Sequence, residues 1–195
     1  MKVEDSTLTV VRALERMGVR HYVTGSLASS LHGEPRATND ADVVAALSVQ
    51  HFVRLREELA GRFYVDEEDF LHAVKSERSF NLVDEVELAK VDIFCVAPAG
   101  YQAEAFARAE TLELERDDPF TSVHVASAED VLLSKLRWYR LGQESSDRQW
   151  RDVLGIARAQ VGRLDLPYLR RWSGEQGTLD LLERVLADAA TPSGL

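Results

Sequence analysis

The chain has 195 residues, which is the length of one domain or of one domain with a small appendage. Hydrophobic residues make up 45% and charged residues 29%, and the formal net charge of −10 argues against wrapping duplex DNA, which needs a basic face. No apolar run approaches the roughly 18 residues of a membrane span, and the first residues lack the plan of a signal peptide. Because the single cysteine, Cys95, cannot form an internal disulfide, we expect a cytoplasmic protein without a membrane partner.

Helices and strands alternate through the first two thirds of the chain. Apolar residues at helical spacing predict a helix over 6–17, and Gly18 supplies its C-terminal stop. A short strand over 21–24 runs into Gly25-Ser26, and a strand over 41–47 is apolar enough to be buried on both faces. Further helices are expected over 26–32, 49–59 and 102–109, and over 70–74 after an acidic helix start at 66–69. Further strands are expected over 63–65, 80–83, 89–96, 111–114 and 122–125, and those over 80–83 and 89–96 can form a hairpin.

From Ser127 onward the pattern becomes helical. Helices are predicted over 127–141, 147–160, 167–173 and 179–187. The fold class is therefore α+β, a mixed sheet flanked by helices and followed by a C-terminal helical subdomain. We expect an α/β domain over 1–126 and a helical subdomain over 127–195 that packs against it.

Two aspartates, Asp40 and Asp42, open the apolar strand 41–47. Residues i and i+2 of a strand point to the same face, about 6.6 Å apart, so both carboxylates can grip one site. Carboxylate oxygens are the ligands that Mg²⁺ prefers. Acidic residues at this spacing occur six times in the chain, but only this pair leads directly into an apolar strand, where unpaired charges are costly without a counter-ion.

Two other features gather around the acid pair. Gly25-Ser26 lies between a strand and a helix, where glycine lets a phosphate approach the backbone and the helix N-terminus offers free N–H groups. A third acid, Asp92, lies between apolar residues on a predicted strand. It is either an aspartate of an edge strand paired with Lys90 or an arginine, or a third metal ligand that also takes the proton of an attacking hydroxyl.

These motifs together resemble the signature of the DNA polymerase β-like nucleotidyltransferase superfamily. The run from Gly33 to Asp42, GEPRATNDAD, is similar to the Gly-x-x-Arg-x-Thr-x-Asp-x-Asp pattern of its small bacterial branches, which include proteins related to toxin–antitoxin nucleotidyltransferases. The resemblance covers about residues 8–185. It is most specific in the three-part acid motif and weaker in the C-terminal part.

The resemblance implies a nucleotidyltransferase-type fold, a nucleoside triphosphate as ligand and Mg²⁺ as cofactor, with two ions bound alongside the nucleotide. Asp40 and Asp42 would hold the ions, Asp92 would help activate the acceptor hydroxyl, and Gly25-Ser26 would hold the outer phosphates. The implied reaction moves a nucleoside monophosphate to a hydroxyl acceptor, which can be a protein side chain, an RNA end or a small molecule.

Three more residues are candidates for nucleotide binding. Arg36 and Thr38 precede the acid pair and either contact phosphate or hold the loop. Lys135 lies on the apolar stripe of its predicted helix, where its amine needs water or an anion. Either its aliphatic part lies along the apolar surface so that the amine reaches water at the edge, or the amine reaches across to a phosphate.

Competing functions leave parts of this pattern unexplained. An Asp-x-Asp phosphatase would not account for Gly25-Ser26 or for Asp92, and no Gly-x-x-x-x-Gly-Lys-Ser/Thr run of a P-loop hydrolase is present. The remaining alternative is a non-catalytic module of the same fold, such as an antitoxin-like binding partner. Loss of an acid or of the Gly-Ser pair would mark such a module, and all of these residues are present.

Overall fold

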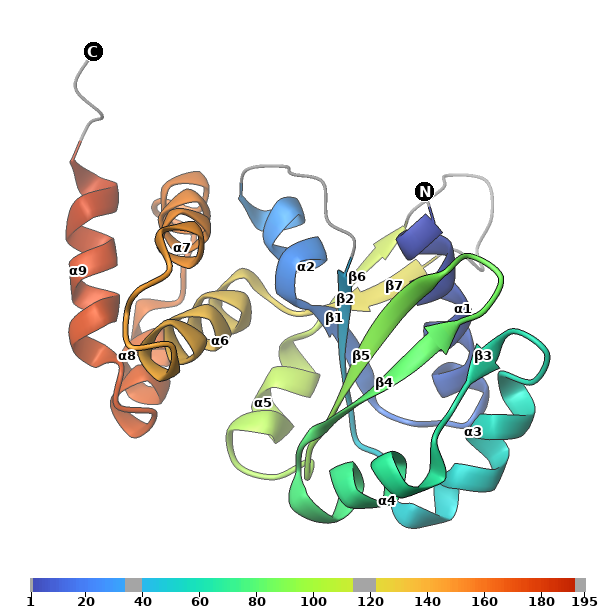
Figure 1. Cartoon of the computed structure of the whole chain (residues 1–195). Coiled ribbons are helices and arrows are strands. Elements are labelled where there is room, and N and C mark those ends of the chain that lie inside the picture. Colours follow the sequence, from blue (N-terminus) through green and yellow to red (C-terminus); the bar gives the residue numbers. More distant parts are fainter. Residues whose placement is uncertain (1, 34–39, 114–121, 192–195) are drawn as a thin grey trace. The chain divides into compact units, whose positions relative to one another are not determined.

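A computed structural model describes residues 2–33, 40–113 and 122–191 (Figure 1). Its contacts divide the chain into two compact units, Met1–Leu27 with Ala37–Ala126, and Ala28–Arg36 with Ser127–Leu195. The second unit thus takes in Ala28–Arg36, which the sequence-based division assigns to the first domain.

The first unit is built on a seven-stranded mixed sheet in the order β3-β4-β5-β2-β1-β7-β6. Strand β2 pairs in parallel with β5, and β1 pairs in parallel with β7, whereas the other neighbours are antiparallel. The strands are β1 (His21–Thr24), β2 (Asp40–Ala45), β3 (Phe63–Tyr64), β4 (Ser79–Asp84), β5 (Ala89–Cys95), β6 (Glu110–Glu113) and β7 (Ser122–Val125). The helices that belong to this unit are α1 (Lys2–Arg16), the 3₁₀ turn η1 (Val49–His51), α3 (Phe52–Glu58), α4 (Glu67–Ser76) and α5 (Tyr101–Arg108), and α2 (Gly25–His32) begins in it.

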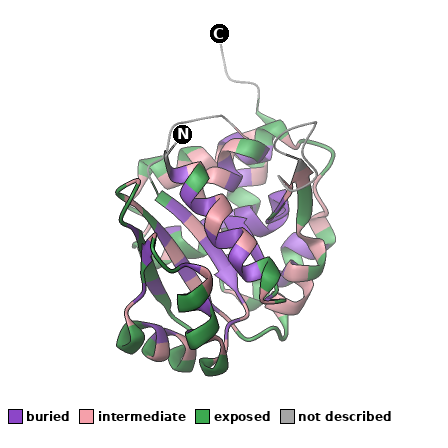
Figure 2. Cartoon of the chain, turned by 90° about the vertical axis from the view of Figure 1, so that its right-hand side faces the viewer, coloured by how far each residue is buried: buried purple, intermediate pink, exposed green. Residues whose placement is uncertain are grey.

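The two faces of this sheet differ in character. Buried and exposed residues alternate strictly along β4, with Phe80, Leu82 and Asp84 on the buried face. Figure 2 shows buried residues (purple) gathered in the interior and exposed residues (green) on outward-facing helix surfaces and loops. Helices α1 and α4 cover the buried face of the sheet, because α1 packs against β5 and β2 and α4 packs against β4 and β5. On the opposite face, Phe106 of α5 packs edge-on against Tyr22 of β1, with 5.3 Å between ring centroids. The residues of this opposite face on β4 and β5 are largely exposed or half-buried.

The second unit consists of helices packed on one another. Helix α6 contacts α7 and α8, and α9 contacts α7 and α8. Gln160 donates a side-chain hydrogen bond of 3.0 Å to the carbonyl of His32, which ties the end of α2 to the end of α7. These helices are α6 (Ala128–Leu141), α7 (Asp147–Ala159), α8 (Leu166–Glu175) and α9 (Leu179–Ala190).

The α+β fold class predicted from the sequence is confirmed, and the element boundaries differ only near their ends. Helix α1 begins at Lys2 rather than at residue 6, since Glu4 and Asp5 favour its first turn and Val3 extends its buried stripe. Helix α4 begins at Glu67, within the acidic stretch 66–69 that the sequence marks as its start, because the Asp66 carboxylate accepts a capping bond from the backbone of Asp69. No helix in the described ranges is long and apolar enough to cross a membrane.

A buried carboxylate ties the sheet to the first helix. Asp84 is fully buried at the end of β4 and accepts bonds from Arg62 Nε at 2.9 Å and from Ser6 Oγ at 2.6 Å. Its other oxygen accepts the backbone N–H groups of Val86 and Glu87, each at 3.0 Å. Burial opposes ionisation, but these bonds outweigh it and lower the pKa of Asp84 from 3.8 to about 2.

This network generates a stability prediction. We expect Asp84→Asn to lower the free energy of unfolding by about 2 kcal/mol at pH 7, the scale of hydrogen bonds to a charged group. Because the folded-state pKa is depressed, the contribution is present above pH 3.8 and is lost as the pH falls towards about 2. Urea unfolding at several pH values measures the difference, with the exposed Glu57→Gln as the control. An equal cost at pH 7 and pH 2 would contradict this origin.

Candidate active site

Asp42 and Asp92 lie side by side on the exposed face of the sheet. They are register partners on the parallel strands β2 and β5, so their side chains leave the sheet on the same face. The row continues to Thr24 of β1 on one side and to Asn81 of β4 on the other. Both carboxylates are half-buried, and the strands beneath them carry the buried residues Val43 and Ile93. The two acids therefore lie next to each other on central strands whose opposite face is packed in the apolar core.

Gly25 presses its backbone against the Asp42 carboxylate. Its φ of +64° lies in the left-handed region, and a Cβ added there would lie 1.8 Å from Asp42 Oδ2. Only glycine fits, because any side chain would overlap the acid as well as strain the backbone. Gly25 is also the first residue of α2, so the contact places an Asp42 oxygen beside the N-terminus of that helix. The Gly25-Ser26 turn and Asp42, which are separate motifs in the sequence, therefore lie side by side in the structure.

Asp40 and Lys90 form the next row on the same face. Asp40 is exposed at the start of β2 and is the register partner of Lys90 on β5. Lys90 Nζ lies 3.0 Å from Asp92 Oδ1, within ion-pair distance. This approach does not meet hydrogen-bond geometry, and the buried Asp92 Oδ1 has no hydrogen-bond partner among the described residues. The contact is an ion pair nonetheless, since a lysine ammonium attracts a carboxylate at 3.0 Å whatever its alignment.

The residues present suit Mg²⁺ bound together with a phosphate ligand. Carboxylate oxygens are the right donors, and the buried Asp92 Oδ1 lacks a hydrogen bond. Within the described ranges, no three Asp, Glu, His or Cys side chains gather closely enough to hold a metal ion by themselves. Mg²⁺ is commonly held by one or two carboxylates plus substrate phosphates, which is what Asp42 and Asp92 beside a helix N-terminus could offer.

The other candidates from the sequence have different outcomes. Ser26 follows Gly25 in the first turn of α2. Arg36 and Thr38 lie outside the described residues. Lys135 is buried, and its ammonium pairs with Asp152 of α7 at 2.8 Å, a partner from its own unit that sequence reasoning did not find. A role of Lys135 at a phosphate stays a prediction.

Sequence reasoning raised Lys90 only as a possible partner of Asp92 and missed Asn81. The sequence favours a hairpin of the strands over 80–83 and 89–96, and β4 and β5 do pair, but the register that places both residues on the acid face was not predicted. The alternative for Asp92 is wrong in one half and confirmed in the other: β5 is not an edge strand, since it lies between β4 and β2, but Asp92 does pair with Lys90 at 3.0 Å.

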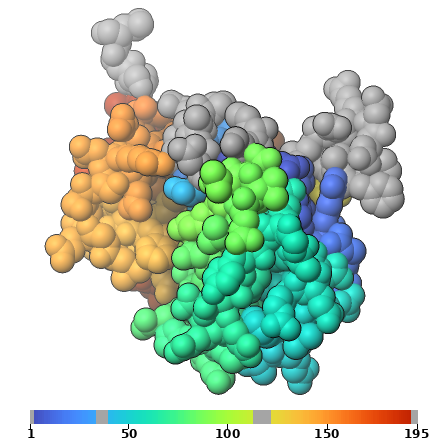
Figure 3. All heavy atoms as spheres, turned by 45° about the vertical axis from the view of Figure 1, so that its right-hand side comes forward, coloured from blue at the N-terminus to red at the C-terminus, as the bar shows by residue number. Residues whose placement is uncertain are grey.

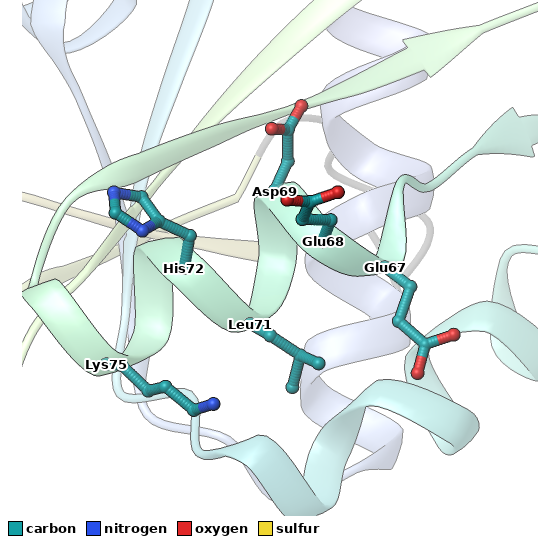
Figure 4. Close-up of a pocket in the computed structure, with 6 residues that line it drawn as sticks. All are labelled: Glu67, Glu68, Asp69, Leu71, His72 and Lys75. Carbon is teal, nitrogen blue, oxygen red and sulfur yellow. The ribbon is translucent and has the colours of Figure 1, made fainter.

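A shallow surface pocket lies elsewhere, along α4. Figure 4 shows that its lining side chains all come from this one helix, among them His72 and Lys75 beside an acidic first turn. In Figure 3, the surface of α3, α4 and the β4–β5 region (cyan to green) faces the viewer. None of the predicted site residues lines the pocket, and an acidic helix surface of this kind is typical of a solvated face.

Similar solved structures exist, although no family model and no curated protein matches the chain. An antigenic nucleotidyltransferase-like protein from Paracoccidioides brasiliensis is 14% identical, with a TM-score of 0.56 over 95% of this chain and 92% of that one. The antibiotic-resistance factor ANT(2'')-Ia is 15% identical, with a TM-score of 0.53 over 94% and 97%. The lincosamide antibiotic adenylyltransferase LnuA, with lincomycin bound, is 14% identical, with a TM-score of 0.50 over 78% and 95%.

These likenesses establish the fold. At 14–15% identity they say nothing about which residues act or on what substrate. They do extend over most of each chain, and the architecture is a mixed sheet flanked by helices and followed by C-terminal helices. The fold is therefore of the nucleotidyltransferase type.

The contact of Gly25 with Asp42 predicts an unequal response of two glycines. We expect Gly25→Ala to destabilise the protein by about 1–3 kcal/mol more than Gly18→Ala, the usual cost of inserting a group into a packed contact. Gly18 is the matched control, since its φ of +70° imposes the same backbone strain but nothing lies within 4 Å of an added Cβ. Urea unfolding of both variants measures the difference. Equal losses would mean that the Asp42 contact yields at no cost.

Proposed function

We propose that this chain is a Mg²⁺-dependent nucleotidyltransferase that moves a nucleoside monophosphate from a nucleoside triphosphate to a hydroxyl of a so far unidentified acceptor. The observation that carries the proposal is the joint placement of Asp42, Asp92 and the Gly25 turn at one end of the sheet. The nucleotidyltransferase-type fold supports it independently.

The proposal assigns a role to each part of the site. The first turn of α2, with Gly25 and Ser26, would receive the outer phosphates through its backbone N–H groups. Asp40 and Asp42, with Asp92, would hold two Mg²⁺ ions. When bound, these ions would offset the charge that develops on the attacking and leaving oxygens. Arg36 and Thr38 would add contacts to phosphate from the segment that precedes Asp40.

The transfer step follows from these positions. The acceptor oxygen attacks the α-phosphorus, the bond from this phosphorus to the oxygen that bridges to the β-phosphate breaks, and pyrophosphate leaves with the bonding electrons. The hydroxyl proton passes to the Asp92 carboxylate, whose Oδ1 accepts no hydrogen bond from residues 2–33, 40–113 or 122–191. Asp92 then releases the proton to water.

The proposal also covers the class of acceptor and the cellular compartment. The names of LnuA and ANT(2'')-Ia connect those proteins with antibiotics, so hydroxylated small molecules come first in a screen, followed by RNA ends and proteins. A reducing cytoplasm suits Cys95, a buried thiol whose pKa burial raises to about 12, which makes it inert. A place in a toxin–antitoxin pair is the setting that the sequence resemblance suggests.

Exchange of single carboxylates separates binding from turnover. We expect Asp42→Asn to lower Mg²⁺-ATP or Mg²⁺-GTP affinity at least about ten-fold and to abolish transfer, because it removes a phosphate-side ligand. Asp92→Asn should retain affinity within a few-fold and slow transfer about 10²–10⁴-fold, the scale of lost general base catalysis. Calorimetry measures affinity, and transfer of an α-phosphate label measures turnover.

The control for these exchanges is Glu57→Gln, which removes one exposed acid from α3 and should leave both quantities unchanged. Absence of Mg²⁺-dependent nucleotide binding by the wild-type chain would refute the proposal. Binding without transfer to any acceptor class would favour a non-catalytic module of the same fold.

Lys135 allows a second test, because its ion-pair partner can be changed separately. We propose that Lys135 also contributes to phosphate binding, and expect Lys135→Met to weaken Mg²⁺-ATP affinity about ten-fold. Asp152→Asn breaks the same 2.8 Å pair but keeps the lysine charge, so it should leave affinity intact or raise it. Equal affinities of all three proteins in calorimetry would assign Lys135 to the packing of α6 on α7 alone.

A further inference from the structure

Within the part of the chain that the structure describes, a lysine lies among the predicted metal ligands on the acid face of the sheet. Lys90 lies two residues before Asp92 on β5 and is the register partner of Asp40, so the three side chains leave the same face. The Lys90 side chain is 45% exposed, and its ammonium nevertheless lies against Asp92 Oδ1 rather than extending into water. The cation therefore stands beside the carboxylate oxygen that lacks a hydrogen bond.

The position of Lys90 makes its ammonium a competitor of divalent cations for the Asp92 carboxylate. Asp40, Asp42 and Asp92 bring three negative charges to two adjacent strands, and they repel one another in the absence of a counter-ion. An ammonium 3.0 Å from Asp92 offsets part of this repulsion. A divalent ion at the same oxygen would meet the positive charge of Lys90, so the lysine must move before the ion can bind.

We propose that Lys90 is an internal counter-ion that occupies the cation position at Asp92 while the site is free of nucleotide, and that a divalent ion binds there by displacing it. The inference rests on the proposed function in taking Asp92 as a metal ligand. It gives Lys90 a positioning role: the lysine keeps the acids apart from free ions, and the triphosphate supplies the further ligands that make displacement favourable. Lys90 would thus link ion binding to nucleotide binding.

Mn²⁺ binding to the nucleotide-free chain of residues 1–195 tests this role. Electron paramagnetic resonance of unbound Mn²⁺ gives the dissociation constant for wild type, Lys90→Met and Lys90→Arg. We expect Lys90→Met to bind Mn²⁺ on the order of five-fold more tightly, since a half-exposed pair is worth up to about 1 kcal/mol. Lys90→Arg should stay at the wild-type value. Arg158→Met removes one exposed positive charge from α7 and serves as the control for net charge.

One further variant and one further measurement make the outcome specific. Adding Asp92→Asn to Lys90→Met should cancel the gain in Mn²⁺ affinity, because it removes the oxygen that the lysine vacates. A lysine with a merely structural role would change the urea midpoint but not the Mn²⁺ affinity. Unchanged, weaker or absent Mn²⁺ binding in Lys90→Met would overturn the inference.

The same proteins distinguish this inference from the proposed function. Calorimetry with Mg²⁺-ATP reports on the function, whereas the Mn²⁺ titration contains no nucleotide. Tighter Mn²⁺ binding in Lys90→Met without any nucleotide binding would uphold the counter-ion and refute the transferase. Normal nucleotide binding with an unchanged Mn²⁺ affinity in Lys90→Met would do the reverse.

Discussion

The contact between Gly25 and Asp42 is the constraint on which the site depends. The left-handed glycine lets the chain turn from β1 into α2 while its backbone touches the carboxylate of the neighbouring strand. The antiparallel register of β1 and β2 sets Thr24 opposite Asp42, and the parallel register of β2 and β5 sets Asp92 on the other side. One short segment thus joins a helix N-terminus, which favours anions, to acids that favour cations. A metal-bound triphosphate, the proposed ligand, would satisfy both.

The rest of the first unit supports the acids from the opposite face of the sheet. Val43, Val91 and Ile93 are buried beneath the acids, and the helices α1 and α4 cover that face. Asp84 locks the end of β4 to α1 through Ser6 and Arg62, so the strand next to β5 is anchored by charge as well as by apolar packing. The opposite face, away from α1 and α4, carries the three acids and Lys90 in two adjacent rows.

Much of the fold could be predicted from sequence because its signals are local. The strand at His21–Thr24 and the helix starting at Gly25 follow from a short apolar run and a glycine, and both were placed within a residue. Grouping the three acids predicts that the strands of Asp42 and Asp92 are neighbours, as β2 and β5 are. The order of the other strands and the registers could not be predicted, since they depend on contacts between residues far apart in the sequence. For the same reason the sequence suggested that three acids belong together but not that Gly25 touches Asp42. The Lys135–Asp152 pair was missed because it joins two helices whose packing has no sequence signal.

The position of a bound ion tests the central claim most directly. A crystal of the protein grown with Mn²⁺ and an ATP analogue that resists cleavage at the α-phosphate would locate the metal by its anomalous scattering. The account predicts a metal peak coordinated by Asp42 and Asp92, with the outer phosphates at the backbone of Gly25 and Ser26 and with Lys90 withdrawn from Asp92. A nucleotide bound elsewhere, or a metal that contacts neither aspartate, would contradict it.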